Sequence, residues 1–173
     1  MSPSSYIAVV VAATCACAYP SAASAQKKTP YGVTADVANG SALLKAATYT
    51  FTPGQPSYDK TVDQAIITAI DREMSARGVK KVTSGPDLVV TYLSVRRTDV
   101  DLKSTPSAKD GTLREYAVGT LIVSISDPAD RQKKLFNGRI DKPLDLDPAT
   151  YEATINAAVA AIFEKYPLKG KTP

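Results

Sequence analysis

The residues best suited to catalysis are Ser57 and Lys60, which have the Ser-x-x-Lys spacing. In penicillin-binding enzymes this spacing places a nucleophilic serine beside a lysine on the first turn of a helix. The companion Ser-Asp-Asn and Lys-Thr-Gly elements do not occur in the sequence. We therefore expect Ser57 to cap a helix rather than to act as a nucleophile. Residues 170–172 mimic the end of a P-loop, but Lys165 stands where the earlier glycine belongs and no helix is predicted after them.

Two groups of aspartates could hold a cation such as Ca²⁺, which prefers carboxylate oxygens. One group contains Asp141, Asp145 and Asp147, and the other contains Asp99 and Asp101. Neither group has the ligand order or the glycine of an EF-hand loop, and Asp147 is placed to cap a helix. We expect solvated acidic loops here. The sequence thus predicts no catalytic residue, no metal ligand and no cofactor.

The composition excludes several chemistries. The chain has 173 residues and no His, so it lacks Ser-His-Asp catalysis, Cys-His catalysis and imidazole metal sites. It carries 21 Lys and Arg against 17 Asp and Glu, a net charge of +4. Because these basic residues are scattered and form no recognition motif, we expect no nucleic-acid binding.

Two short basic groups could meet an anionic lipid or polymer surface. They are Arg96 with Arg97, and Arg131 with Lys133 and Lys134. Salt screens such scattered charges, so we expect a solvated surface, with peripheral membrane association as an open alternative. Tyrosines on strands could stack on sugars, but a half-buried ring with a hydrated hydroxyl is the expected state.

Residues 1–25 have the features of a signal peptide. They contain no charged side chain, and residues 6–18 form an apolar stretch that is too short to span a bilayer comfortably. Ala23 and Ala25 supply the small residues that signal peptidase recognises, so we predict cleavage after Ala25. The mature protein would then be periplasmic or secreted, and it would begin with a flexible tail over residues 26–32.

Two alternatives to this interpretation of the N-terminal segment stay open. A signal peptide usually has Lys or Arg before its apolar stretch, but residues 1–5 contain neither. The segment could therefore be a buried part of the fold instead. Cys15 or Cys17 could instead carry a lipid anchor to the outer membrane. Both cysteines lack the aliphatic residue three positions earlier that lipoprotein signals usually have.

Hydrophobic periodicity predicts two helices in the mature chain. Apolar residues recur at three- and four-residue spacing over residues 57–77, with Ser57 or Asp59 as the N-cap and Gly78 just after the end. A second helix begins at Asp147 and runs to about residue 166. These faces must pack against strands.

Short runs of alternating or β-branched residues predict the strands. They cover residues 33–37, 47–51, 87–95, 115–126 and 134–141, and residues 79–82 form a brief extended piece. The last two strands should form a hairpin around a turn at residues 127–130. Residues 98–113 are predicted either to extend the strand before them in part or to form a long polar loop throughout, and such a loop could carry function.

These elements predict a single α+β domain over residues 33–168, followed by a C-terminal tail over residues 169–173. The expected fold is a twisted, mostly antiparallel sheet of about five strands with both helices packed on one face. A chain of this size can bury a stable core without disulfides.

Four motifs along the domain occur in a familiar order. They are the strand at residues 47–53, Pro-Asp-Leu at 86–88, Gly-Thr-Leu at 119–121 and Tyr-Pro at 166–167. Together they resemble the bacterial envelope family catalogued as domain of unknown function 4136, over about residues 33–168. The resemblance implies an exported protein, often a lipoprotein, and it brings no established activity. Asn137 departs from the family pattern, which usually has Trp before the glycine at Gly138, and a clear lipid-attachment Cys is missing.

The sequence therefore favours a non-enzymatic binding or accessory module of the cell envelope. Its partner, whether protein, lipid or polysaccharide, is not defined by the residues. The alternative is a hydrolase of cell-wall or small envelope substrates, which would need Ser57 and Lys60, or two carboxylates, to meet in a pocket.

Overall fold

The computed structural model describes residues 32–168, with gaps at 53 and 145–146. Four features predicted from the sequence lie outside these residues: the signal peptide with Ala23, Ala25, Cys15 and Cys17, nearly all of the tail over 26–32, Asp145, and the C-terminal tail with 170–172. Within the described residues, no helix is both long enough and apolar enough to cross a membrane.

Six strands and three α-helices make up the described chain. The strands are β1 (Gly32–Val37), β2 (Thr48–Phe51), β3 (Lys80–Lys81), β4 (Leu88–Val100), β5 (Glu115–Ser126) and β6 (Lys134–Pro143). The helices are α1 (Gly40–Lys45), α2 (Lys60–Ala76) and α3 (Tyr151–Phe163), and a single 3₁₀ turn, η1 (Pro148–Thr150), precedes α3.

The strands form one open sheet in the order β1-β6-β5-β4-β2-β3. The pairs β1–β6, β6–β5 and β5–β4 are antiparallel, whereas β2 runs parallel to both β3 and β4. The predicted α+β class is confirmed, but the sheet is mixed and has six strands. The parallel edge arises because α2 connects β2 to the following strands as a crossover, which is the connection that parallel strands need.

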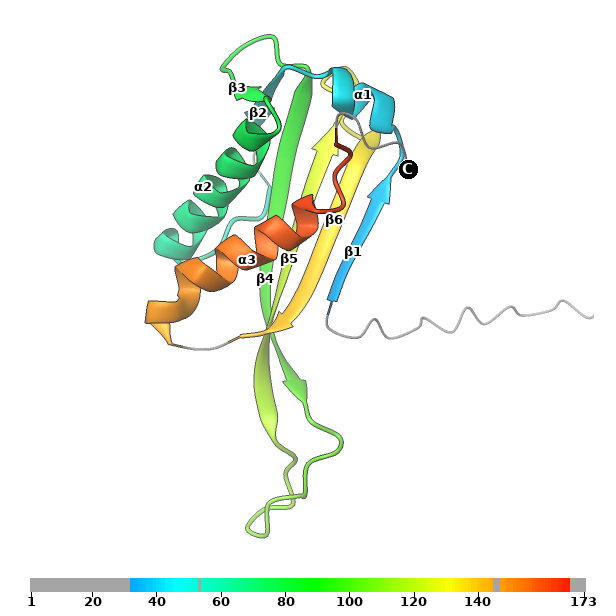
Figure 1. The fold of residues 1–173 in the computed structure, drawn as a ribbon. Coiled ribbons are helices and arrows are strands. Elements are labelled where there is room, and N and C mark those ends of the chain that lie inside the picture. Colours follow the sequence, from blue (N-terminus) through cyan, green and yellow to red (C-terminus); the bar gives the residue numbers. More distant parts are fainter. Residues whose placement is uncertain (1–31, 53, 145–146, 169–173) are drawn as a thin grey trace, which may run out of the picture.

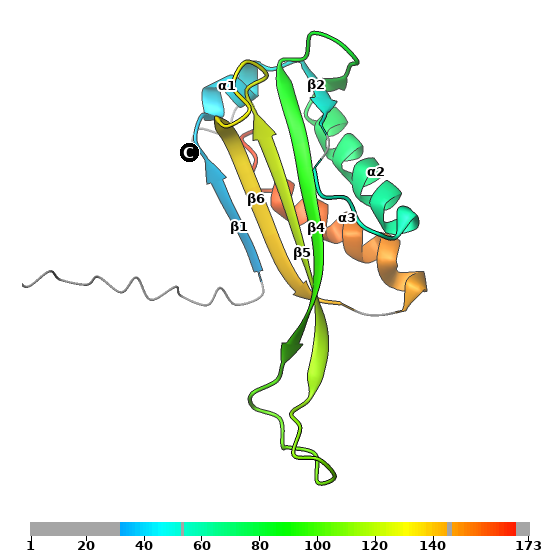
Figure 2. The ribbon, with the colours of Figure 1, turned by 180° about the vertical axis from the view of Figure 1, so that it is seen from behind.

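Helices α2 and α3 cover one face of the sheet, as predicted, and α1 lies at one end of it (Figures 1 and 2). Buried side chains between the helices and the sheet form the core. They include Ile66, Ile70, Met74, Val90, Val123, Ile125, Phe136, Val159, Ile162 and Phe163. The core therefore lies on the helical side, and the other sheet face is open.

Helix α1 was not predicted, because Asn39 and Gly40 were interpreted as a turn. The side chain of Asn39 instead caps the helix by accepting a hydrogen bond from the N–H of Ala42 at 3.0 Å. Leu43 is fully buried in the core and holds this short helix against the sheet. One buried side chain and a cap suffice here, although six residues are too few to show periodicity.

The two longer helices begin in different ways. Asp59 is the N-cap of α2, and its carboxylate accepts from the N–H of Thr61 at 2.8 Å, so the expectation that Ser57 caps this helix is wrong. Gly78 follows α2 with a φ of 77°, as the αL position after a helix requires. The prediction that Asp147 caps α3 is wrong by one turn: Asp147 accepts from the N–H of Ala149 at 3.0 Å and so caps the 3₁₀ turn instead.

A β-hairpin arm projects from the body of the protein (Figures 1 and 2). Strand β4 continues to Val100, where it pairs with Glu115 of β5, so the first residues of the 98–113 segment extend the strand and the rest form the loop. The connecting residues 101–114 form a tip held by local turns, such as the 2.8 Å bond from the N–H of Gly111 to the carbonyl of Ser107. The side chain of Leu102 is 73% exposed on this arm.

Candidate functional site

Helices α2 and α3 are joined at their C-terminal ends through Arg77. Its guanidinium donates to Glu73 at 2.8 Å and to the carbonyl of Phe163 at 2.6 Å. It also lies 5.0 Å from the centre of the Phe163 ring and 5.7 Å from that of Tyr166, which are cation–π distances. This contact fixes the spacing of the helices at one end.

At their N-terminal ends the same two helices leave an apolar cleft above the sheet. The cleft has a volume of about 310 Å³. Its walls come from Val62 and Ile66 on α2 and from Ile155 and Ala158 on α3, and its floor includes Leu121 on β5. This size and lining are typical of a small-molecule site at the lower end of the usual range.

Gly119 and Leu144 shape the floor and the far end of the cleft. A Cβ atom on Gly119 would lie 2.7 Å from a methyl carbon of Leu144, so only glycine lets this leucine fold over the sheet. The N–H of Leu144 donates to the carbonyl of Ala117 at 2.9 Å and fixes the segment after β6. The cleft is thus built by the end of β6 as well as by the helices.

Two basic residues line the cleft on either side of Gly119. Strand register places Arg96 of β4 opposite Gly119 of β5, which is opposite Lys142 of β6. Their Cα atoms are therefore two strand spacings apart, about 10 Å, with no side chain on the residue between them. Among the described residues, no carboxylate lies within 4.0 Å of either cation. The apolar cleft consequently carries positive charge along one row of its floor.

Ser57 and Lys60, the pair that the alternative hydrolase would need, do not meet in this cleft. Ser57 lines it, but Lys60 is not among the lining residues. The N–H of Ser57 donates to the carboxylate of Asp63 at 3.2 Å, so the residue helps to fix the segment before α2. Asp59, the other carboxylate nearby, is engaged as the N-cap of α2.

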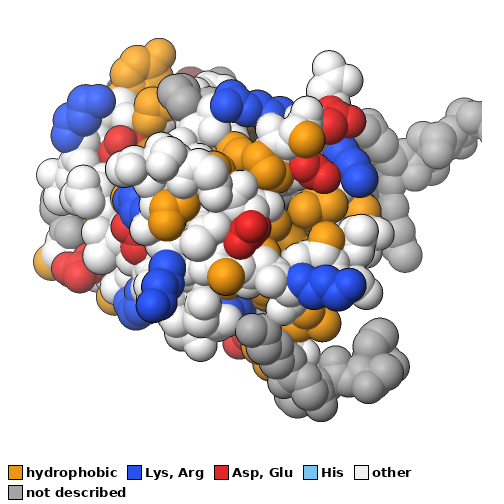
Figure 3. Space-filling view, turned by 90° about the horizontal axis from the view of Figure 1, so that it is seen from above, with side chains coloured by type: hydrophobic (Ala, Val, Ile, Leu, Met, Phe, Trp, Pro, Cys, Tyr) orange, Lys and Arg blue, Asp and Glu red, His pale blue; other side chains and the backbone are white. Residues whose placement is uncertain are grey.

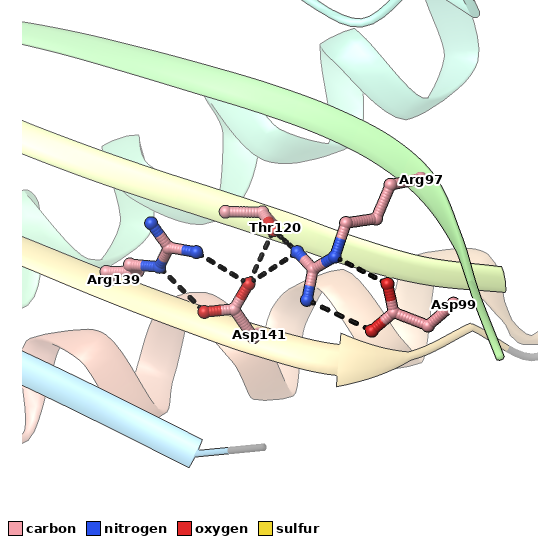
Figure 4. A network of polar contacts seen from close by, with 5 residues as sticks. All are labelled: Arg97, Asp99, Thr120, Arg139 and Asp141. Carbon is pink, nitrogen blue, oxygen red and sulfur yellow. Dashed lines mark hydrogen bonds and ion pairs between the residues drawn. The ribbon is translucent and has the colours of Figure 1, made fainter. Parts of the chain in front are cut away.

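The open face of the sheet carries a polar network that spans three strands (Figure 4). Arg97 on β4 bridges Asp99 at 3.0 Å and Asp141 on β6 at 2.9 Å. Arg139 pairs with the same Asp141 at 2.7 Å, and Thr120 on β5 donates its hydroxyl to it. The Arg139 hydrogen bond, supported by those from Thr120 and Arg97, holds the pKa of Asp141 well below its usual range. These charges satisfy one another and stabilise the sheet.

Arg96 and Arg97, predicted as one basic group, point to opposite faces of the sheet because side chains alternate along a strand. Arg96 faces the helices and Arg97 faces the open side, so the pair does not form one basic surface. Asp101 accepts from the N–H of Lys103 at 3.0 Å within the arm. In the described part of the chain, no three His, Cys, Asp or Glu side chains are arranged to hold a metal ion.

Basic and acidic side chains alternate with hydrophobic ones on the end of the molecule that carries α1 (Figure 3). Lys133 pairs with Asp127 at 3.7 Å in the β5–β6 turn, next to Arg131 and Lys134, which are exposed. The basic residues of this turn are thus solvated or paired, as expected.

Three tyrosines are buried and have structural roles. Burial and the hydrogen bonds to Asp71 and Asp63 raise the pKa values of Tyr49 and Tyr92. Burial raises the pKa of Tyr166 to about 12. By contrast, Tyr58 is fully exposed beside the cleft mouth.

Comparison with known proteins places the chain in a family. Residues 33–168 match the family described as domain of unknown function DUF4136. The chain belongs to this family. No curated protein matches it significantly.

Two solved structures share the fold of this DUF4136 domain at low sequence identity. One is a PDZ domain protein from Parabacteroides distasonis, with 13% identity and a TM-score of 0.55 over 83% of this chain; the match covers only 36% of that protein. The other is a PelC dodecamer from Paraburkholderia phytofirmans, with 9% identity and a TM-score of 0.51 over 79% of this chain and 98% of that one. A minor lipoprotein from Acinetobacter baumannii is more distant, with 13% identity and a TM-score of 0.45 over 70% of this chain and 90% of that one. These likenesses concern the fold alone.

The family motifs now have physical roles. The carboxylate of Asp87 accepts from the N–H groups of Ala47 and Thr48 at 2.9 and 3.0 Å, so the Pro-Asp-Leu motif ties the start of β4 to the start of β2. These bonds lower the pKa of Asp87. Asn137, at the position of the usual Trp, faces the open side and accepts from the Ser124 hydroxyl at 2.7 Å.

The sequence did not reveal the cleft. Its helical wall residues are predicted as ordinary core positions, and no sequence pattern marks Lys142 or Leu144. The free volume depends on the angle between α2 and α3, which periodicity does not encode. The sequence does show a glycine, Gly119, on a predicted strand. Only the strand register shows that this glycine lies between Arg96 and Lys142.

Proposed function

We propose that the protein is an exported, non-enzymatic binding module of the bacterial envelope and that the α2–α3 cleft is its binding site. Two observations support the location: the signal-like segment over residues 1–25 and membership of DUF4136. A lipid anchor on Cys15 or Cys17 is the alternative form of the same envelope location.

The observation that carries the binding function is the chemistry of the cleft wall. Apolar side chains dominate the wall, Asp59 is engaged as the N-cap of α2, and the other polar lining residues are hydroxyl groups and the cations Arg96 and Lys142. A hydrolase would need a nucleophile with a base, or two facing carboxylates, at the substrate position. Ser57 without Lys60 does not supply this, so binding without turnover is the better-supported function.

The neutral fluorescent probe N-phenyl-1-naphthylamine tests the cleft as a binding site. We expect its fluorescence to rise with the protein, and Ala158→Phe to weaken binding roughly tenfold because the ring fills the cleft. Ala157→Phe, on the exposed side of the same helix, is the matched control and should bind as the parent does. Thr154→Leu fills the same wall more gently, in case the larger ring disturbs folding. Equal binding by all of these proteins would refute the site.

The β4–β5 arm is a second surface for contact with an envelope partner. Val100 is 44% exposed on it and Leu102 is 73% exposed, although both are apolar. Apolar side chains exposed on a projecting hairpin suit recognition of another protein better than they suit solvent. The arm includes residues 98–113, the segment for which the sequence predicted contact.

A further inference from the structure

The cleft combines an apolar interior with two cations, Arg96 and Lys142, that have no carboxylate partner among the described residues. The arginines on the open face of the same sheet differ, since Arg97 pairs with Asp99 and Asp141, and Arg139 pairs with Asp141. Both side chains are exposed, so solvent screens their field in part, but no carboxylate neutralises it at the cleft.

Arg96 and Lys142 together suit a single anionic group at the cleft. The two cations start about 10 Å apart on the same face of the sheet, and the side chain of Leu144 lies over Gly119 between them. Both side chains are long enough to reach a group held beside that leucine, where the cleft that they line begins. Asp59 is the sole carboxylate among the described lining residues, and it is directed toward the N–H groups of Thr61 and Val62. The charge balance of the cleft therefore favours an anion.

The remaining volume fits one apolar chain. Beyond the cations the lining is mainly apolar, with Val62, Ile66, Ile155 and Ala158 among the residues, and Ser94 and Thr154 add hydroxyl groups. A volume of about 310 Å³ lies at the lower end for ligand sites, which favours one chain over a two-chain lipid. A sugar or peptide would leave many of its polar groups without partners against a mainly apolar lining.

From this geometry we propose that the cleft binds a free single-chain amphiphile, with its tail between α2 and α3 and its anionic headgroup beside Arg96 and Lys142. This inference rests on the proposed function, because it names the ligand class of the same site. The headgroup would gain charge-assisted hydrogen bonds, and the tail would be removed from water.

Calorimetric titration with three ten-carbon probes tests the ligand class. Decanoate, decanol and decyltrimethylammonium have ten-carbon chains and carry negative, zero and positive headgroups; the two ions are used below their micelle concentrations and decanol below its solubility. We expect decanoate to bind the protein at least roughly tenfold more tightly than the cationic probe. Equal affinities for all three probes, or binding to anionic vesicles without binding to decanoate, would overturn the proposal.

A pair of double variants tests the position of the headgroup. Arg96→Gln with Lys142→Gln should weaken decanoate binding by roughly five- to tenfold and leave decanol binding unchanged. Arg131→Gln with Lys134→Gln removes the same charge at an exposed turn and is the matched control, expected to bind decanoate as the parent does. If both double variants weaken decanoate equally, only net charge matters and the proposal fails.

The naphthylamine probe separates the failure of this inference from that of the proposed function. If that probe still binds in the cleft while decanoate does not, the ligand class is wrong and the binding site stands. If neither binds, both proposals are wrong.

Discussion

Arg97 on β4 and Asp141 on β6 form a 2.9 Å ion pair across the intervening strand β5. The side chain of Asp141 is only 8% exposed, whereas those of Arg97 and Arg139 are 38% and 46% exposed. The carboxylate is thus buried between two half-exposed guanidinium groups. It links the three central strands where the arm leaves the sheet.

Replacing this carboxylate should destabilise the protein at neutral pH. Asp141→Asn removes the charge that both arginines share, and partial exposure of the arginines limits the cost to about 1–2 kcal/mol. Urea unfolding at pH 7 measures the change in the free energy of unfolding. Asp36→Asn, on the exposed edge strand β1, removes an equal charge and should cost almost nothing.

The effect of Asp141→Asn should fade in acid. Because the pKa of Asp141 is lowered on folding, the folded state favours the ionised group, and this stabilisation is present above the ordinary value of 3.8. It is lost as pH falls below 3.8 toward the lower folded value. A gap between parent and variant that stayed constant from pH 7 to pH 2 would contradict this role.

The second prediction concerns the contact of Gly138 with α3. A Cβ atom at this position would lie 2.4 Å from Cγ2 of Ile162. Gly138→Ala should therefore push α3 away from β6 and lower the free energy of unfolding by about 1–3 kcal/mol. Gly40→Ala is the control: its new methyl would meet nothing closer than 3.7 Å, so thermal unfolding should show no loss of stability. Equal stability of the two variants would be evidence against this packing.

The third prediction concerns the arm. Trypsin should make its first cut within the described chain at Lys103, Lys109 or Arg114, all exposed in the tip over residues 101–114. The two fragments should stay together in gel filtration, because β4 and β5 each pair with another strand of the body. Joining Val100 to Glu115 through Asn-Gly should remove these cuts and change the unfolding free energy by less than about 0.5 kcal/mol. An earlier cut in α2 or α3 would show that the body is the weaker part.

The fourth prediction concerns export. Intact-mass measurement of the protein from cell fractions should show a chain that begins at Gln26, without lipid, in the periplasmic or secreted fraction. Ala25→Tyr should leave the precursor uncut, whereas Ala22→Tyr, outside the two recognised positions, should be processed normally. A lipid-modified Cys15 or Cys17 in the membrane fraction would instead establish anchoring.

The sequence predicts those parts of the fold that depend on local periodicity. The apolar spacing of α2, its Asp59 cap and Gly78 after its end are all as expected, because each is set by neighbouring residues. Helix α1 was missed because six residues around Leu43 contain less than two turns of pattern. The parallel pairing of β2 with β4 was missed because it depends on the path of the chain through α2.

The site depends on relationships that sequence reasoning did not reach. Arg96 and Arg97 are neighbours in sequence, yet one lines the cleft and the other joins the network on the opposite face. Arg96 and Lys142 are remote in sequence and share one row of the sheet. The register of β4 on β5 and of β5 on β6 brings them together. The sequence does not predict how these three strands align.

Amide chemical-shift mapping of the isotopically labelled protein during titration with decanoate tests the central claim, that the α2–α3 cleft is the binding site. We expect shifts at residues 57–66 and 151–158, and on the strands at Ser94, Arg96, Gly119, Leu121, Ile140 and Lys142, with the arm and the open-face residues Arg97, Asp99 and Arg139 unchanged. Shifts confined to residues 98–114 or to the Arg97–Asp141 network, or no shifts at any concentration below micelle formation, would contradict it.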